Sequence, residues 1–366
     1  MNRQTLIAIL GAFSIMLSFA SCKQKSQASA PAQETPKDTL VVEVKQHIKS
    51  NGIYHWKTTF NLNQEETDFL GKNNVSRMYV RFFDVDVESS PMANTRSAVP
   101  VGTTRFMTAK PDSVEIVPTV FITVKTILLC ASNSASVYDL ASKIYTRVMN
   151  MADYNDMGPV HEIQLDCDWT TSTMDAFYSL CQAVRTLARK DSLEVSSTIR
   201  LHQLRQDPPP VDKGVLMVYN TGDIRSQATS NSILDLEDVY AYLNGKPISY
   251  SLPLDIALPV YGWGVLFRDG AYTGILHHSD FNDSGLYKRG NGDSYTVRKD
   301  HMLDGRQLLK GDVIRREYPD AEEIDKAARR VAASFKDTVH DIILYHLDSD
   351  NLSKYSDDEI SRFYSY

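Results

Sequence analysis

The feature that most constrains the fold is a repeated alternation of short apolar segments with longer amphipathic ones. The apolar segments are nearly continuous, without the strict polar alternation of a strand that faces water on one side. They therefore indicate strands buried on both faces, as in a parallel sheet. The segments are residues 53–57, 78–85, 116–126, 160–170, 193–201, 214–220, 255–263 and 341–347.

Most of these segments are separated by stretches with helical spacing. The clearest is 174–190, where Phe177, Leu180 and Val184 fall on one face. Acidic residues at 63–66 and 320–323 mark two further helix starts, because the helix dipole favours negative charge in the first turn.

Strand–helix units repeated about eight times in a chain of 366 residues are typical of a (β/α)8 barrel of the TIM type. We therefore predict this α/β fold. Residues 264–320, rich in Gly, Asp, Tyr and His, are expected to form an irregular insertion after strand seven. A doubly wound open sheet is the alternative, and the lack of a Gly-rich phosphate loop after any strand disfavours it.

The N-terminus resembles a bacterial lipoprotein signal. An apolar region, 6–19, follows Arg3 and has the length of a signal peptide, which is too short to span a bilayer. Small residues then precede Cys22, the position that is lipidated in lipoproteins. We expect 1–22 to be a lipoprotein signal peptide with lipidation at Cys22. An ordinary signal peptide with a chance cysteine is the alternative.

The remaining boundaries follow from composition. Residues 23–45 are mostly polar and are expected to form a flexible tether. The barrel is expected over 46–350 and a C-terminal tail over 351–366. By resemblance to lipoprotein sorting, Lys23 in place of Asp favours the outer membrane of the cell envelope. The sequence leaves the face of that membrane open.

Charge and motifs exclude several classes of partner. The net charge of −7 argues against nucleic acid, because neutralising phosphates requires a basic face. No cofactor motif is present, so no cofactor is expected. His277 and His278 point to opposite sides of an extended chain and lack a third ligand at useful spacing, so no metal site is expected. The predicted partners are a glycan and, through the anchor, a membrane; a protein partner is not identifiable.

The cysteines after Cys22 do not form a recognisable pattern. Cys130, Cys167 and Cys181 lack a CxxC spacing and are odd in number. We expect three buried free thiols, and a Cys167–Cys181 bridge is the alternative left open.

Carboxylates and aromatic residues gather at the predicted C-terminal ends of the strands, where barrel enzymes place their active sites. Asp166 and Asp168, two places apart at the end of the fourth strand, are the leading catalytic candidates. Asp84 and Asp348 are weaker ones. The candidates for substrate binding are Trp56, Arg200, Tyr219, Asn220, Tyr261 and Trp263.

These residue types suit a sugar ligand. Aromatic rings match the apolar faces of sugar rings, and paired carboxylates can hydrolyse a glycosidic bond. Each candidate also has a structural interpretation. Asp166 or Asp168 can cap the following helix or pair with Arg200, and Trp56 and Trp263 can pack the barrel mouth.

Residues 165–169 (LDCDW) resemble the fourth-strand signature Asp-x-x-Asp-x-Asp-x-Glu of chitinase-type (family 18) glycoside hydrolases. In that family the final Glu is the general acid, and the Asp before it assists the acetamido group of the substrate. Matching Asp166 and Asp168 to the last two Asp positions puts Ile163 at the first Asp and Thr170 at the Glu. The resemblance thus implies a glycosidase-like barrel without the family's acid. The chain also resembles bacterial lipoproteins that carry such a barrel.

Three functions follow as hypotheses. The protein acts on a glycan, in which case two carboxylates should face each other across a cleft. It binds a glycan or protein without chemistry, in which case an aromatic groove should have its carboxylates tied to arginine. It is a scaffold, in which case the barrel mouth should be filled and the insertion should expose an apolar patch.

Overall fold

The computed structural model describes residues 49–90, 95–131, 134–243, 248–277, 280–335 and 340–366. Cys22, the signal peptide, the tether and His278 lie outside these residues. No helix in the described part of the chain is long and apolar enough to cross a membrane.

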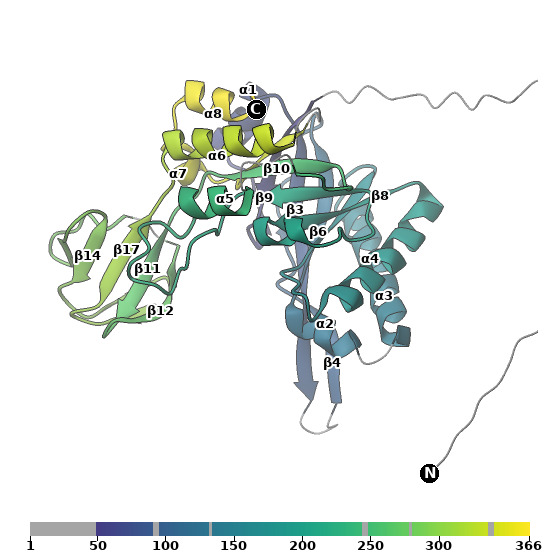
Figure 1. The fold of residues 1–366 in the computed structure, drawn as a ribbon, viewed down its shortest axis with the longest axis horizontal. Coiled ribbons are helices and arrows are strands. Elements are labelled where there is room, and N and C mark those ends of the chain that lie inside the picture. The colour runs from purple at the N-terminus through teal and green to yellow at the C-terminus, as the bar shows by residue number, and fades with distance from the viewer. Residues whose placement is uncertain (1–48, 91–94, 132–133, 244–247, 278–279, 336–339) are drawn as a thin grey trace, which may run out of the picture. The chain divides into compact units, whose positions relative to one another are not determined.

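The core of the molecule is a closed barrel of eight parallel strands, as predicted (Figure 1). The first strand pairs with both the last strand and the second one, which closes the ring. In spatial order the barrel strands are β1 (Asn51–His55), β18 (Ile342–Tyr345), β10 (Leu254–Pro259), β9 (Lys213–Met217), β8 (Glu194–Arg200), β7 (Glu162–Asp166), β6 (Glu115–Ile122) and β3 (Val75–Ser90).

Burial explains the near-continuous apolar pattern of these strands. Every residue of β7 is buried, because one face lines the barrel interior and the other packs under the helices. Ile163 and Leu165 belong to the large core beneath the helices, whereas Tyr54, Tyr79 and Val215 belong to a second core inside the barrel.

Helices flank the barrel and account for most of the predicted helical segments. Asn63 and Asp320 form capping boxes at the starts of α1 and α6, which explains the acidic residues that follow them. No α-helix follows β8; the short 3-10 turn η2 (Leu201–Arg205) replaces it. The helices are α1 (Gln64–Lys72), α2 (Val124–Ala131), α3 (Ser134–Tyr154), α4 (Met174–Ala188, continued by the 3-10 turn η1, Arg189–Asp191), α5 (Leu236–Leu243), α6 (Ala321–Ser334), α7 (Ser349–Leu352) and α8 (Asp357–Phe363).

The second barrel strand is longer than its apolar segment, 78–85, indicated. β3 continues beyond the barrel to Ser90 and pairs antiparallel with β4 (Thr95–Val101), beside α2 (Figure 1). The third strand also ends earlier than predicted. β6 stops at Ile122, because Thr123 starts α2 and accepts backbone hydrogen bonds from Thr126.

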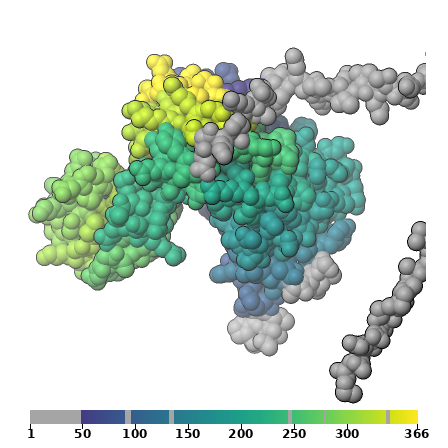
Figure 2. All heavy atoms as spheres, viewed as in Figure 1, coloured from purple at the N-terminus to yellow at the C-terminus, as the bar shows by residue number. Residues whose placement is uncertain are grey.

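The insertion after strand seven is regular, which corrects the prediction of an irregular segment. Its strands form an antiparallel sheet in the order β12-β11-β17-β14-β13, with a core that includes Leu266, Phe281 and Ile314. In Figure 2 this inserted sheet forms a light-green lobe beside the barrel. The strands are β11 (Trp263–Arg268), β12 (Ala271–Leu276), β13 (Tyr287–Arg289), β14 (Ser294–Val297) and β17 (Val313–Glu317), plus the hairpin β15 (His301–Leu303) with β16 (Arg306–Leu308). Elsewhere, β2 (Thr59–Phe60) pairs with β5 (Arg105–Phe106).

The C-terminal residues expected to form a tail are helical and packed. Phe363 in α8 is fully buried, and the Tyr364 hydroxyl donates to the carbonyl oxygen of Gly52 in β1 at 3.0 Å. This segment therefore covers the outside of the first barrel strand.

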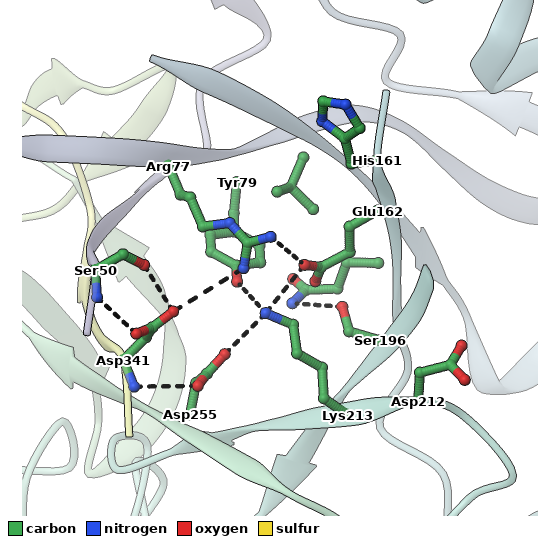
Figure 3. A network of polar contacts seen from close by, with 12 residues as sticks. Ser50, Arg77, Tyr79, His161, Glu162, Ser196, Asp212, Lys213, Asp255 and Asp341 are labelled. Carbon is green, nitrogen blue, oxygen red and sulfur yellow. Dashed lines mark hydrogen bonds and ion pairs between the residues drawn. The ribbon is translucent and has the colours of Figure 1, made fainter. Parts of the chain in front are cut away.

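A charged network fills the barrel at the N-terminal ends of its strands (Figure 3). Lys213 Nζ lies 3.0 Å from carboxylate oxygens of both Glu162 and Asp255, and Arg77 Nη2 lies 3.3 Å from Glu162. Asp341 accepts hydrogen bonds from the backbone and side chain of Ser50. Because this end of a barrel serves stability, we interpret the network as structural.

The described cysteines carry free, buried thiols, as the leading interpretation of the sequence held. Burial raises the pKa of both Cys167 and Cys181, so neither is poised as a thiolate.

Candidate functional site

A cleft crosses the C-terminal ends of the barrel strands, where the sequence placed the site. It consists of three adjoining depressions of about 320, 270 and 710 Å³. Tyr219 and Arg200 line the first two, Trp56 and Tyr345 line the second and third, and Asn220 lines all three. Shared walls of this kind suit an extended ligand that passes from one depression to the next.

Asp166 lies at the floor of the central depression. It ends β7, is almost fully buried, and accepts a hydrogen bond from Thr198 Oγ1 at 2.6 Å. Burial raises the pKa of Asp166 to about 6, and the positive charge of Arg200 opposes part of that rise. The pKa of Asp166 therefore lies closer to neutral pH than that of an ordinary aspartate.

Asp168 is tied to Arg200. Arg200 Nε and Nη2 lie 2.7 and 2.6 Å from one oxygen of Asp168, so the guanidinium grips it with two nitrogens. The pairing with Arg200, which the sequence left open as an alternative to catalysis, is present in the structure. The guanidinium engages one carboxylate oxygen of Asp168, while 54% of the Asp168 side chain stays exposed.

Asp84 is held in the same way by a neighbour on its own strand. Arg81 Nε donates to Asp84 at 2.7 Å, and Arg81 Nη2 bonds its second oxygen. The Arg81 guanidinium also lies 5.9 Å from the ring of Trp56, which places a cation over an aromatic at the edge of the cleft.

Asp348 is a helix cap with an ion-pair partner. Its Oδ1 accepts from the backbone N–H of Asn351 at the start of α7, and its Oδ2 lies 2.9 Å from Lys57 Nζ. Burial alone would raise the pKa of Asp348, but the hydrogen bond and charge of Lys57 bring it below the ordinary value. Asp348 lines the 710 Å³ depression rather than the one around Asp166.

Thr170, at the position of the missing acid, belongs to the turn that starts α4. Its N–H donates to Thr173 Oγ1 at 2.9 Å, and its hydroxyl lies 3.0 Å from Ser172 Oγ. The next-door Trp169 is fully buried against Phe177. Neither residue lines any of the three depressions.

The predicted aromatic residues do meet, in one continuous wall. Trp56, Tyr219 and Tyr261 each contact Tyr345, with ring centroids 6.0, 4.9 and 5.2 Å apart. Trp263 extends the wall and lies 5.4 Å from Tyr261. It does so from the first residue of β11, whereas the sequence analysis placed it at the end of barrel strand seven.

Asn220 positions this wall through its backbone conformation. It adopts a left-handed φ of 54°, which Asn tolerates better than most residues. Its side-chain oxygen then accepts a hydrogen bond from the Tyr261 hydroxyl at 2.7 Å. The Tyr219 hydroxyl and Arg200 Nη1 are buried without a hydrogen-bond partner among the described residues. Both residues line the central depression, where these two atoms leave hydrogen-bonding capacity unused.

Two contributors were missed in the sequence. Tyr345, the central ring of the wall, ends β18 directly before His346, and a strand-end aromatic was the available signal. Arg81 sits inside an apolar strand, where no pattern marks it as a partner for Asp84. His346 and His277 line the largest depression. No cluster of metal-ligating side chains occurs among the described residues.

No family model matches this sequence, and no curated protein matches it. Solved structures match its fold. A mutant of the Group II chitinase catalytic domain 2 from Ostrinia furnacalis, in complex with penta-N-acetylchitooctaose, matches with a TM-score of 0.50 at 11% identity, over 86% of this chain and 95% of that chain. This chain has a chitinase-like barrel fold.

Two further solved structures match at lower scores. The chitinase-like agglutinin of Robinia pseudoacacia has a TM-score of 0.47 at 14% identity, over 86% of this chain and 99% of that one. The spore cortex-lytic enzyme SleL of Bacillus cereus has a TM-score of 0.47 at 10% identity, over 87% and 75%. At these identities the likeness concerns the fold, and the chemistry of this chitinase-like barrel has to be argued from its own residues.

Proposed function

We propose that this protein binds a glycan in the cleft without cleaving it, as a lipid-anchored component of the cell envelope. The observation that carries the proposal is the pairing of its carboxylates. Asp168, Asp84 and Asp348 are each held by Arg200, Arg81 or Lys57. Most glycoside hydrolases act through two carboxyl groups on the same bond, and here three of the four candidate carboxylates are already paired with a cation.

The aromatic wall supports the binding half of the proposal. Five rings line one cleft, and sugar rings stack on aromatic faces while their hydroxyls bond polar rims. Arg81, Arg200 and Asn220 line the central depression and supply polar groups around it.

Hydrolysis is the second candidate function, and Asp166 favours it. A carboxyl with a pKa of about 6 can donate a proton near neutral pH. In that case Asp166 would act as the acid, and Asp168 would have to leave Arg200 to complete a pair.

Binding and product release on a panel of glycans separate the two functions. The panel starts with N-acetylglucosamine oligomers, because the Ostrinia furnacalis neighbour was crystallised with one, and extends to peptidoglycan fragments. We expect the wild type, Asp166→Asn and Asp168→Asn to bind without releasing product. Product from the wild type that disappears in either variant would establish hydrolysis instead.

The anchor is tested separately through Cys22. We expect wild-type protein to incorporate labelled palmitate and to fractionate with membranes, and Cys22→Ala to do neither. Equal labelling of both proteins would contradict lipidation at Cys22.

A further inference from the structure

Glu317 is a buried carboxylate directly opposite Trp263. The two residues are register partners in the antiparallel pair β11–β17, so their side chains emerge on the same face of that sheet. Trp263 Nε1 donates to Glu317 Oε2 at 2.7 Å. Glu317 is 1% exposed, so this hydrogen bond is shielded from water.

Both oxygens of Glu317 have further partners, from a loop and from its own strand. Oε2 also accepts from the backbone N–H of Ser232 at 2.9 Å and from its hydroxyl. Oε1 accepts from Arg315 Nε at 2.6 Å, and Arg315 Nη1 donates to the carbonyl of Ser226. A carboxylate bonded on both oxygens in a buried site cannot rotate without losing charge-assisted bonds.

The tie at Glu317 orients a ring that faces the largest depression. Trp263 is partly exposed and lines the 710 Å³ depression together with Trp56 and Tyr345. Its ring packs edge-on against Tyr261 at 74°, and the hydrogen bond to Glu317 is the directional contact that fixes the indole N–H. The bond therefore selects one indole orientation.

We propose that Glu317 is a positioning residue that holds Trp263 as a stacking platform for one sugar ring of a bound oligosaccharide. The platform makes the depression between barrel and insertion a sugar subsite of its own, beside the one around Asp166. This inference rests on the proposed glycan binding.

Glu317 increases the affinity for the oligosaccharide by fixing the Trp263 indole before the ligand binds. A pre-oriented indole loses little conformational freedom when a sugar stacks on it, whereas a pivoting one must be ordered at a cost in affinity. The effect appears only with a ligand long enough to reach Trp263. A short oligosaccharide that occupies the Asp166 depression gains nothing from the platform.

A purely structural role for Glu317 makes a different prediction. If the carboxylate only joins β17 to the loop at Ser232, its loss should lower stability and weaken all ligands alike. Coupling to Trp263 distinguishes the two roles, because a positioning residue has no effect once the residue it positions is gone.

The test measures calorimetric affinity for chitohexaose and chitobiose with Glu317→Gln, Trp263→Ala and the double variant. We expect Glu317→Gln to weaken chitohexaose binding about fivefold to tenfold and chitobiose binding less than about twofold. In the Trp263→Ala background, Glu317→Gln should add less than about a twofold loss. Ser232→Ala, which removes a different partner of Glu317, is the matched control and should leave both affinities unchanged.

Trp263→Phe supports the test if Glu317→Gln does not fold. It keeps a six-membered aromatic ring, removes the N–H donor together with the rest of the indole, and should weaken chitohexaose more than chitobiose. Two results would overturn the inference and leave the proposed function standing. One is an affinity for chitohexaose that Glu317→Gln does not change; the other is a loss of affinity from Glu317→Gln that is as large in the Trp263→Ala background as in the wild type. Failure of the wild type to bind any glycan would overturn the proposed function and this inference with it.

Discussion

Arg200 holds Asp168 through two nitrogens on a single carboxylate oxygen, at 2.7 and 2.6 Å. Arg200 ends β8 and Asp168 follows the neighbouring parallel strand β7, so the barrel brings the two residues together. Arg200 also acts on Asp166, whose pKa burial raises and the guanidinium lowers. Arg200 thus forms an ion pair with Asp168 and lowers the pKa of Asp166.

Removing this arginine should raise the pKa of Asp166 further. In Arg200→Met the opposing positive charge is lost while burial stays, so we expect the pKa of Asp166 to rise above about 6. A carbon-13 NMR titration of the aspartate carboxyls measures it. Arg81→Met, which removes the partner of Asp84, is the control and should shift the pKa of Asp166 less. An Asp166 pKa that Arg200→Met leaves unchanged would show that the charge of Arg200 is screened.

The raised pKa of Asp166 makes stability fall as pH rises. The pKa is about 6 in the folded protein against a reference of 3.8. Between these values the folded state holds a proton that the unfolded chain has released, so folding is favoured at the acidic end of the window and loses that advantage above it. We expect Asp166→Asn to match the wild type near pH 4 and to exceed it by about 3 kcal/mol at pH 7.

Urea unfolding of both proteins at several pH values checks this prediction. Asp168→Asn is the matched control, because its carboxylate is largely exposed and ion-paired. A difference between wild type and Asp166→Asn that stays constant from pH 4 to pH 7 would contradict the buried, protonated state of Asp166.

The charged network at the opposite end of the barrel should matter for stability alone. Lys213→Met removes the cation between Glu162 and Asp255 and leaves two buried carboxylates short of a partner. We expect a loss of about 3 kcal/mol or more in the free energy of unfolding. Lys143→Met, in the exposed pair with Asp139, should cost less than about 1 kcal/mol. Equal costs would mean that the network is solvated.

The barrel strands and helix starts were predictable because local rules determine them. Ile163 and Leu165 mark a strand buried on both faces, and Asn63 and Asp320 cap the helices that their acidic followers indicate. The insertion was predicted, but its regular sheet was not, because its strands are short and several pair with partners distant in sequence. Trp263 was assigned to strand seven because apolar residues continue from β10 almost without interruption into β11.

The candidate site was predictable as a set of positions and not as a set of pairings. Asp166, Arg200 and Tyr219 lie at or next to the C-terminal ends of parallel strands, which is why the sequence could assign them to one cleft. Which carboxylate forms an ion pair depends on side-chain geometry. The hydrogen bonds from Arg81 to Asp84 and from Trp263 to Glu317 could not be predicted from the spacing of these residues in the sequence.

Tyr345 should be the aromatic residue whose loss costs most affinity. It contacts three other rings of the wall and lines two of the three depressions. We expect Tyr345→Ala to weaken oligosaccharide binding at least about tenfold, because both stacking area and the packing of its neighbours are lost. Tyr138→Ala, an exposed tyrosine on α3, is the control for removing a ring elsewhere. If Tyr345→Ala binds as tightly as the wild type, the aromatic wall does not take part in binding.

The central claim is that the cleft binds a glycan and leaves it intact. The most direct test incubates wild-type protein with chitohexaose and peptidoglycan fragments, measures binding by calorimetry, and follows product by mass spectrometry. We predict saturable binding, sensitive to Tyr345→Ala, with no product after prolonged incubation. Product that depends on Asp166 would contradict the claim and make this barrel a hydrolase.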